Sequence, residues 1–526
     1  MTKTKRGKIF FWLAVIIFLT AISFQDALGL LRHSPDSFYY LPDTDVNVYF
    51  SYLDQAREGQ FLFYNQFTSE GQPARLFFPL WAVGGYLGRL FSLNNQKIYL
   101  ILKLVLAAGL LYLVFRFFEF LLNPAFSGAK SNNWTSPEQG WFWPAWLLTI
   151  FGGGSLAWGQ AHDFLFMSLL NPLVSLALIL LLGIFWLTAF FLKKPNYLIS
   201  LAAGSLALLL TLIHPYDGLA VFMVLSLQIV LTAVFRPASL KKYLLHYLVV
   251  LAGIFLGYLY YFYLFHNFPA FAGWLAQNVL PHKGLAWFIK SFGPFYLLAV
   301  LGLFYLIKDK RYAGQFNLMV SWLAAVLLFL VLPVFTAAKL FIGLTIPLGL
   351  FAGYFILRLS QRLKSSYLKF LAIFLTVIIL SLYNFSLLAT DSAAVVKRTQ
   401  PFYLPLDYLK PVLWLKDNLS LTETVLASDK WDTFIGGRCA CRVFIGGNQT
   451  NRSADKIRLL NRFYGDNQSD GQKLEFLKTY SVDYVYFSPA EKEKGDFRPQ
   501  EKDYLKEVYN DGWAQIFRVV SRGDNP

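Results

Sequence analysis

Pro42-Asp43-Thr44-Asp45-Val46-Asn47-Val48-Tyr49 opens a stretch, ending at Thr68, that is polar, aromatic and acidic in an otherwise apolar chain. Residues 46–60 alternate apolar and polar side chains at helical spacing, which predicts a helix that begins near Asp43 or Asp45 and is capped by one of them. Two carboxylates beside a membrane surface are costly unless they bind a cation or take part in chemistry. We therefore expect Asp43 and Asp45 to bind a cation or to take part in chemistry; the alternative, that both only cap the helix, stays open.

The composition is that of a polytopic membrane protein. Of 526 residues, 56% are hydrophobic, 18% aromatic and only 15% charged, and long uncharged segments recur. The net charge of +16 does not indicate a nucleic-acid partner, because residues 390–526 hold 20 Lys and Arg against 19 Asp and Glu. The other 27 basic and 12 acidic residues lie in the apolar part, where cationic loops on one side of a bilayer account for them.

Eleven apolar segments approach the length of about 20 residues that crosses a bilayer. They cover residues 9–25, 97–121, 141–157, 172–192, 197–213, 218–235, 244–265, 285–307, 316–335, 340–357 and 367–387. A further segment, 76–93, is interrupted by Pro79, three glycines and Arg89, and we assign it to an interfacial helix.

The basic residues give these spans a direction. With 76–93 not spanning, 18 of the 27 basic residues of this part fall on one side, which the positive-inside rule makes the cytoplasm. The basic N-terminal tail, followed by an uncleaved first span, is then cytoplasmic, and the C-terminal part is extracytoplasmic. The expected location is a prokaryotic plasma membrane.

This orientation gathers the chemically useful residues on the outer face. His162 and Asp163, in the second outer loop, could complete a Mg²⁺ or Mn²⁺ site with Asp45; the alternative, helix capping and interfacial hydrogen bonding, stays open. The turn His214-Pro215-Tyr216-Asp217-Gly218 is more polar than a tight turn requires. Lys339 suits a lipid phosphate, or simply extends to the interface. The expected substrate-binding residues are His214, Tyr216, Asp217, Lys339, Arg75, Asp54, Glu70 and Tyr49.

The composition changes near residue 390. Expected helices at 406–418, 454–464 (capped by Ser453) and 471–480 (capped by Asp470) alternate with expected strands at 425–427, 482–487 and 515–519. This alternation predicts a small α/β domain over residues 390–526, after a membrane domain over 1–389 whose first outer loop covers 26–96. Cys439 and Cys441 are either a metal-binding pair, a strained disulfide or ordinary thiols.

These features resemble the GT-C superfamily of membrane glycosyltransferases, which includes oligosaccharyltransferase catalytic subunits, protein O-mannosyltransferases and aminoarabinose-lipid transferases. The matching residues are Asp43 and Asp45 after the first span, and His162-Asp163 where oligosaccharyltransferases carry a second acidic motif. The interfacial helix before the second span and the outer α/β tail also match. The tail lacks a Trp-Trp-Asp motif, and the second motif is His-Asp instead of two acids.

The resemblance implies an inverting transfer of a sugar from a polyprenyl-phosphate donor to an extracytoplasmic lipid, glycan or protein. Asp45 would act as base, and a divalent cation on Asp45, His162 and Asp163, or else Lys339 and Arg75, would balance charge on the leaving phosphate. Two other classes stay open. A transporter or flippase would place ionisable groups near the middle of the membrane, and a non-catalytic scaffold would leave Asp43, Asp45 and His162 apart.

Overall fold

The computed structural model describes residues 3–32, 36–41, 44–122, 137–152, 169–235, 237–268, 270–271, 284–309, 316–331, 337–431, 433–465 and 468–520. Backbone contacts divide the chain into two compact units. The first contains Met1–Gln25, Leu100–Tyr261 and Leu280–Ala393; the second contains Asp26–Tyr99, Phe262–Val279 and Ala394–Pro526. The loop after α1, predicted to be the first outer loop, and the C-terminal tail thus share one compact unit.

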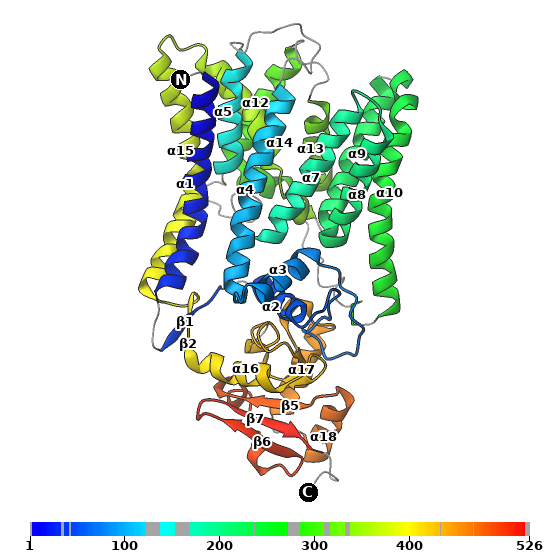
Figure 1. Ribbon diagram of the computed structural model, residues 1–526, viewed down its shortest axis with the longest axis vertical. Helices are drawn as coiled ribbons and strands as arrows, with labels where there is room; N and C mark the ends of the chain where they lie inside the picture. The colour runs from blue at the N-terminus through cyan, green and yellow to red at the C-terminus, as the bar shows by residue number, and fades with distance from the viewer. Residues whose placement is uncertain are drawn as a thin grey trace. The chain divides into compact units, whose positions relative to one another are not determined.

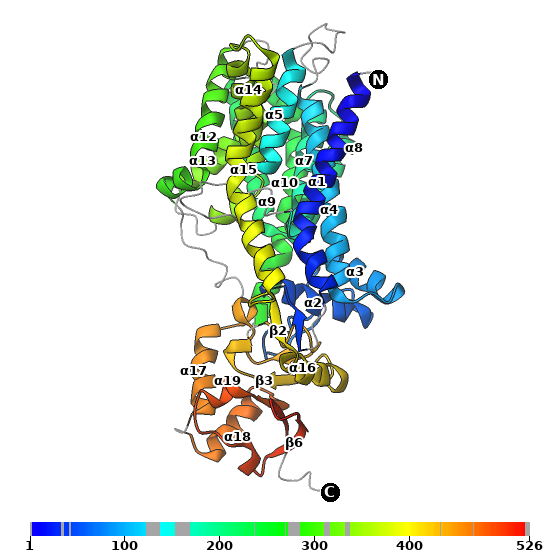
Figure 2. The same cartoon turned by 90° about the vertical axis from the view of Figure 1, so that its left-hand side faces the viewer.

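A helix overlaps each of the eleven apolar segments, and together these helices make the helical bundle that the sequence predicts. They are α1 (Lys3–Leu31), α4 (Asn95–Leu122), α5 (Pro137–Phe151), α7 (Pro172–Phe191), α8 (Tyr197–Ile213), α9 (Pro215–Phe235), α10 (Pro237–Asn267), α12 (Leu285–Lys308), α13 (Asn317–Val331), α14 (Thr345–Ser360) and α15 (Ser366–Lys397). Within the first unit the axes of these helices are roughly aligned, and the chain runs up some of them and down others (Figures 1 and 2). Among the described residues, seven helices are long and apolar enough to cross a membrane and four apolar helices are shorter, so the chain is an integral membrane protein.

Helix α14 packs between α5 and α12 in the first unit. Small residues allow this contact, because a Cβ atom on Gly302 of α12 would collide with the backbone of Phe351. Where lipid removes the hydrophobic drive for association, such close backbone approach supplies the packing energy. Helix α12 also bends at Pro294, which lacks an amide donor, and at Gly293, whose φ is 34°.

The second unit is built on a five-stranded sheet of order β4-β3-β5-β7-β6. Strands β4 (Arg442–Val443), β3 (Thr424–Leu426) and β5 (Tyr484–Phe487) are parallel, whereas β7 (Gln515–Val519) runs antiparallel to β5 and to β6 (Leu505–Asn510). Helices α16 (Leu406–Asn418), α17 (Ser453–Tyr464), α18 (Asp470–Thr479) and α19 (Pro489–Lys492) connect the strands. The α/β prediction is confirmed, although β4 and the charged edge strand β6 were not expected.

The expected helix caps in this domain are wrong by one residue. Helix α17 begins at Ser453, and its N-cap is Arg452, with φ of 52°. Helix α18 begins at Asp470 and is capped by Ser469, which forms a capping box with Gln472. In both helices the expected cap is the first helical residue, a position that sequence alone places poorly because Ser and Asp suit both sites.

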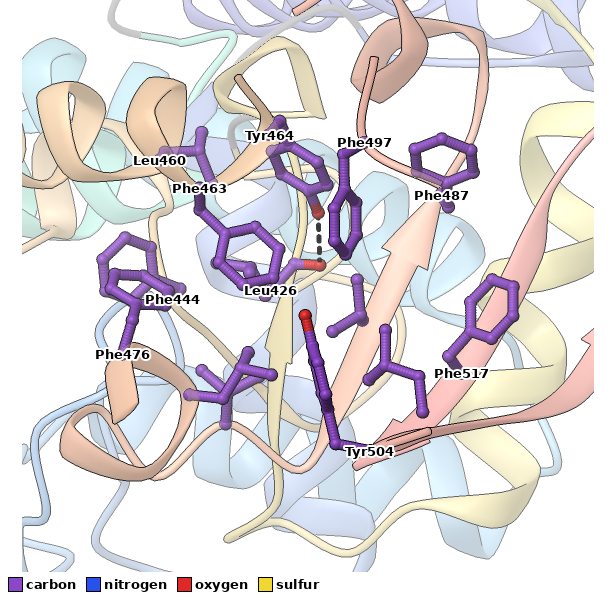
Figure 3. Packing of buried hydrophobic residues seen from close by; sticks show 14 of the residues in the cluster. Leu426, Phe444, Leu460, Phe463, Tyr464, Phe476, Phe487, Phe497, Tyr504 and Phe517 are labelled. Carbon is purple, nitrogen blue, oxygen red and sulfur yellow. Dashed lines mark hydrogen bonds between the residues drawn. The ribbon is translucent and has the colours of Figure 1, made fainter. Parts of the chain in front are cut away.

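An aromatic core fills one side of this sheet (Figure 3). Phe463 and Tyr464 of α17 pack against Phe476 of α18 and against Phe497. The Tyr464 hydroxyl donates hydrogen bonds to the carbonyl oxygens of Leu426, at 3.2 Å, and Tyr486. Large apolar residues thus supply the core, and the one buried hydroxyl among these four aromatic residues is satisfied.

The loop that follows α1 is joined to the tail by backbone pairing. Strand β1 (Ser37–Tyr39) pairs antiparallel with β2 (Tyr403–Pro405), and Thr68 forms an isolated bridge with Ile445. The Val443 amide donates to the Gln66 carbonyl oxygen, and the Thr450 hydroxyl donates to that of Phe67. These contacts join residues more than 360 positions apart, which explains why loop and tail form one unit.

A buried carboxyl makes the stability of the second unit depend on pH. Glu491, 0% exposed, accepts hydrogen bonds from the Ser428 and Ser488 amides, and burial raises its pKa to about 7. The unfolded chain loses this proton near its ordinary pKa of about 4.5, so the native state binds more protons between these values. We expect the unfolding free energy to fall by roughly 2–4 kcal/mol from pH 4.5 to 7 and then to level off.

Hydrogen exchange of β3 and β5 peptides, corrected for its intrinsic pH dependence, measures this effect. Glu491→Gln should abolish the slope, because an amide does not titrate, and Glu493→Gln, at an exposed position, should keep it. A slope that persists unchanged in Glu491→Gln would assign the pH dependence to another group.

Candidate functional site

Helix α2 (Thr44–Arg57) is the first element of the candidate site, and it begins where the sequence predicts. Asp45 lies exposed in its first turn; Asp43 lies outside the described residues. Tyr49, 7% exposed, stacks on Trp81 of α3 (Pro79–Leu90) with ring centroids 4.3 Å apart. Helix α3 packs closely on α2, since a Cβ on Gly85 would strike Leu53 and Ala56. Its place along a membrane surface stays a prediction.

Three other predicted residues of the first loop lie in separate surroundings. Asp54, at the C-terminal end of α2 and 5% exposed, forms an ion pair of 2.9 Å with Lys416 of α16. Glu70 pairs with Lys456 of α17 at 2.9 Å. Arg75 has an exposed side chain. The structure therefore does not bring these residues together, and their contact with substrate stays a prediction.

Lys456 is buried, and its ammonium group also donates to the hydroxyls of Thr68 and Ser69, both at 3.1 Å. Burial lowers the pKa of Lys456, and Glu70 opposes that shift. Glu70→Gln should cost the second unit about 2–3 kcal/mol, because it leaves a buried ammonium group without its counter-ion. The change in hydrogen-exchange protection of α17 measures the loss.

A surface pair supplies the control for this prediction. Glu501→Gln breaks the exposed Arg498–Glu501 contact and should cost under about 0.5 kcal/mol. Adding Lys456→Met to Glu70→Gln should recover much of the stability. If Glu70→Gln and Glu501→Gln lowered the stability of the second unit by the same small amount, the Glu70–Lys456 pair would not stabilise it as we expect.

The turn between α8 and α9 brings four predicted residues of the first unit together. His214 caps the C-terminus of α8, and Pro215 begins α9, where its missing amide donor costs nothing. The His214 Nδ1 and Asp217 Oδ2 atoms are 3.1 Å apart, and Asp217 is 1% exposed. Lys339 Nζ lies 4.0 Å from the centroid of the Tyr216 ring.

The surroundings of this turn hold its backbone in place. The Tyr258 hydroxyl donates to the Pro215 carbonyl oxygen at 2.6 Å, and the Tyr261 hydroxyl donates to that of Leu212 at 2.7 Å. Leu340, next to Lys339, packs with Ala220 of α9. The turn and Lys339 beside it thus bring an imidazole, a buried carboxylate and an ammonium group close together, and groups of these kinds bind hydroxyl and phosphate groups.

Arg438 was missed by the sequence reasoning. Its guanidinium carbon lies 5.8, 5.5, 5.4 and 5.2 Å from the ring centroids of Phe38, Tyr40, Phe50 and Phe434. The adjoining Cys439 and Cys441 form a disulfide, one of the readings left open above. The only sequence signal was the two arginines, Arg438 and Arg442, that flank the cysteines; three of the four rings around Arg438 come from residues 38–50, far away in sequence.

The divalent-cation site cannot be assembled from the described residues. His162 and Asp163 lie outside them, and Asp45 is the one predicted ligand that they include. Among the residues that the structure describes, no group of three or more His, Cys, Asp or Glu could hold a metal ion. The cation therefore stays a prediction.

No protein-family profile and no curated protein sequence matches the chain. Several solved structures, in contrast, are similar to this chain in fold. The archaeal oligosaccharyltransferase AglB from Archaeoglobus fulgidus, in complex with an inhibitory peptide and a dolichol-phosphate, is 12% identical with a TM-score of 0.58, over 99% of this chain and 75% of that one. ArnT from Cupriavidus metallidurans is 12% identical with a TM-score of 0.51, over 100% of both chains.

The arabinofuranosyltransferase AftD from Mycobacteria is 12% identical with a TM-score of 0.53, over 98% of this chain and 40% of that one. The Archaeoglobus enzyme was also solved in complex with Zn and sulfate; this structure is 11% identical with a TM-score of 0.54, over 97% of this chain and 73% of that one. All three proteins are GT-C glycosyltransferases. The chain has the GT-C fold, as the sequence predicts.

Proposed function

We propose that this protein is a membrane glycosyltransferase that transfers a sugar from a polyprenyl-phosphate donor to an extracytoplasmic acceptor. One observation carries the proposal. The GT-C fold extends over 97–100% of the chain in the structures compared above, and the acidic helix α2 follows the first span as the resemblance requires. Because a fold can host several functions, the residues must supply the rest of the argument.

Asp45 is the proposed base. Its carboxylate is exposed at the start of α2, where an acceptor hydroxyl could reach it. As the acceptor oxygen attacks the anomeric carbon, Asp45 takes its proton, and the bond between that carbon and the phosphate oxygen breaks. Configuration at the carbon inverts, because the two bonds lie on opposite faces. Asp43 is the second choice for this role.

The departing lipid phosphate gains negative charge and needs a cationic partner. Lys339 and Arg75 are the proposed partners, and His214, Tyr216 and Asp217 would bind hydroxyl groups of the donor. The complex of the Archaeoglobus enzyme with dolichol-phosphate supports a lipid-phosphate carrier for this chain too. If a divalent cation takes part, Asp45 would hold it together with His162 and Asp163.

Orientation is part of the proposal: the N-terminus lies in the cytoplasm of a prokaryotic cell, and the C-terminal domain lies outside. Mass spectrometry of lipid-linked sugars and glycans in a deletion strain tests the function in the cell. We expect one lipid-linked sugar to accumulate and one glycan to lose that sugar. Unchanged lipid and glycan pools would contradict a transferase.

A further inference from the structure

The second unit contains a cavity of about 880 Å³ that the proposed chemistry does not use. The end of α2, the start of α4, helix α16 and the loop at Arg438 line this cavity, which is partly open to solvent. Its polar lining includes the side chains of Asn94, Asn95, Gln96 and Ser420, which offer hydrogen bonds of the kind that bind sugar hydroxyls.

The charged residues of the lining leave a positive excess. Lys416 and Asp54, which both line the cavity, neutralise one another through their 2.9 Å ion pair. Arg57 donates to the Asn95 side-chain oxygen at 3.1 Å, and Glu58 is exposed to solvent. Arg438 also interacts electrostatically with Asp54, but among the described residues it forms no ion pair with a carboxylate, and one positive charge of the lining stays in excess.

Arg438 is held in an unusual environment for a charge. Its Nε and Nη2 atoms are buried, and neither has a hydrogen-bond partner in the described part of the chain. Burial lowers its pKa to about 10, so the guanidinium group stays charged at neutral pH. Arg438 as a whole is of intermediate exposure. The surrounding rings offset part of the desolvation cost, but a partly buried charge with two nitrogen atoms that lack acceptors among the described residues remains expensive.

A partner from outside the chain would remove this cost. A phosphate or a carboxylate matches the planar fork of donors of a guanidinium group, and the cavity that Arg438 lines is large enough for a sugar that carries one. The Cys439–Cys441 disulfide lies next to Arg438, and Ala440 between the two cysteines also lines the cavity. The covalent bridge limits the conformations open to this part of the wall.

We propose that this cavity binds the oxyanion, phosphate or carboxylate, of an anionic carbohydrate acceptor, an assignment that rests on the proposed transferase function. Arg438 supplies the charge, and Lys416 and the amides at 94–96 orient the sugar around it. The acceptor would then be selected by its negative charge as well as by its hydroxyl groups.

Isothermal titration calorimetry of the purified full-length protein tests the site with inorganic phosphate and glucuronate, with glucose as the neutral control. We expect at least one of the oxyanions to bind and glucose to bind at least tenfold more weakly. Binding of phosphate alone indicates a phosphorylated acceptor; binding of glucuronate alone indicates an acidic sugar. If neither oxyanion binds, the proposal is overturned.

Arg438→Met should weaken oxyanion binding at least tenfold, because it removes the charge while keeping an apolar stem among the rings. Arg442→Met is the matched control: Arg442 faces the Tyr64 ring at 5.9 Å but does not line the cavity, so affinity should be unchanged. Without ligand, Arg438→Met should unfold at the same or a higher temperature than the wild type, since the uncompensated charge is gone. Wild-type affinity in Arg438→Met would exclude the site.

If Arg438→Met does not fold, Arg438→Lys decides the question. A lysine keeps the charge but loses the planar fork, so the affinity should fall about tenfold; unchanged affinity would contradict guanidinium recognition. Calorimetry needs no donor and no turnover. Loss of transfer in an Asp45 variant and loss of oxyanion binding in an Arg438 variant are therefore separate results.

Discussion

Asp45→Asn should lower sugar transfer by on the order of 10²–10⁴-fold while the protein folds normally, because an amide cannot accept the proton of the acceptor hydroxyl. The substitution separates the two roles open to this residue. Asp45 lies in the first turn of α2, where a carboxylate stabilises the helix start by only about 0.3–1 kcal/mol, so an aspartate with that role alone could be replaced with little loss. Initial rates of transfer from a lipid-linked sugar measure the activity, and the thermal unfolding midpoint of the same preparation shows whether the variant is folded.

Asp36→Asn is the control for this experiment. Asp36 is exposed in the same first loop, and no proposed step involves its side chain, so transfer should stay within about twofold of the wild type. Full activity in Asp45→Asn would remove Asp45 from the mechanism, and Asp43 would then be the base to test.

Lys339→Met should lower transfer by roughly 10²–10³-fold, because it removes the positive charge proposed to stabilise the departing phosphate. Lys339→Arg should recover part of the rate, since it keeps the charge on a longer side chain with different geometry. A role in packing over Tyr216 alone would predict lower thermal stability with little change in rate. Rate and thermal midpoint, measured together, distinguish the two.

Lys290→Met is the matched control. Lys290 belongs to the same unit and is exposed on α12, so its loss removes one positive charge without touching the proposed site. Equal rates in the wild type and in Lys339→Met would exclude Lys339 from stabilising the phosphate.

The membrane helices could be predicted because their signal is local. A long apolar segment must form a helix in lipid, where its backbone groups find no other partners, and a helix overlaps each predicted segment. Local sequence patterns also predicted helix α16 and strands β5 and β7 in the tail. It could not predict that residues 26–99 join the tail, since the pairing of β1 with β2 depends on partners more than 360 positions away.

In the candidate site, too, the residues that are neighbours in sequence could be predicted, and those brought together from distant segments could not. His214, Tyr216 and Asp217 are neighbours in sequence, so a single turn was expected to hold them together, and the structure adds Lys339 beside Tyr216. Arg438 gave no comparable signal, because its aromatic surroundings come from residues 38–50 and 434. The Glu70–Lys456 pair likewise spans two distant segments, which is why its contribution to stability was not foreseen.

The central claim, transfer of a sugar from a lipid carrier, is tested most directly in proteoliposomes that contain the purified protein and lipid-linked sugars extracted from its own cells. After addition of cell-envelope acceptors, mass spectrometry follows the lipid and the acceptor together. We predict release of polyprenyl phosphate and an equal gain of sugar on the acceptor, both abolished by Asp45→Asn. Lipid-linked sugar that crosses the bilayer intact, or that stays unconsumed beside folded protein, would contradict the account.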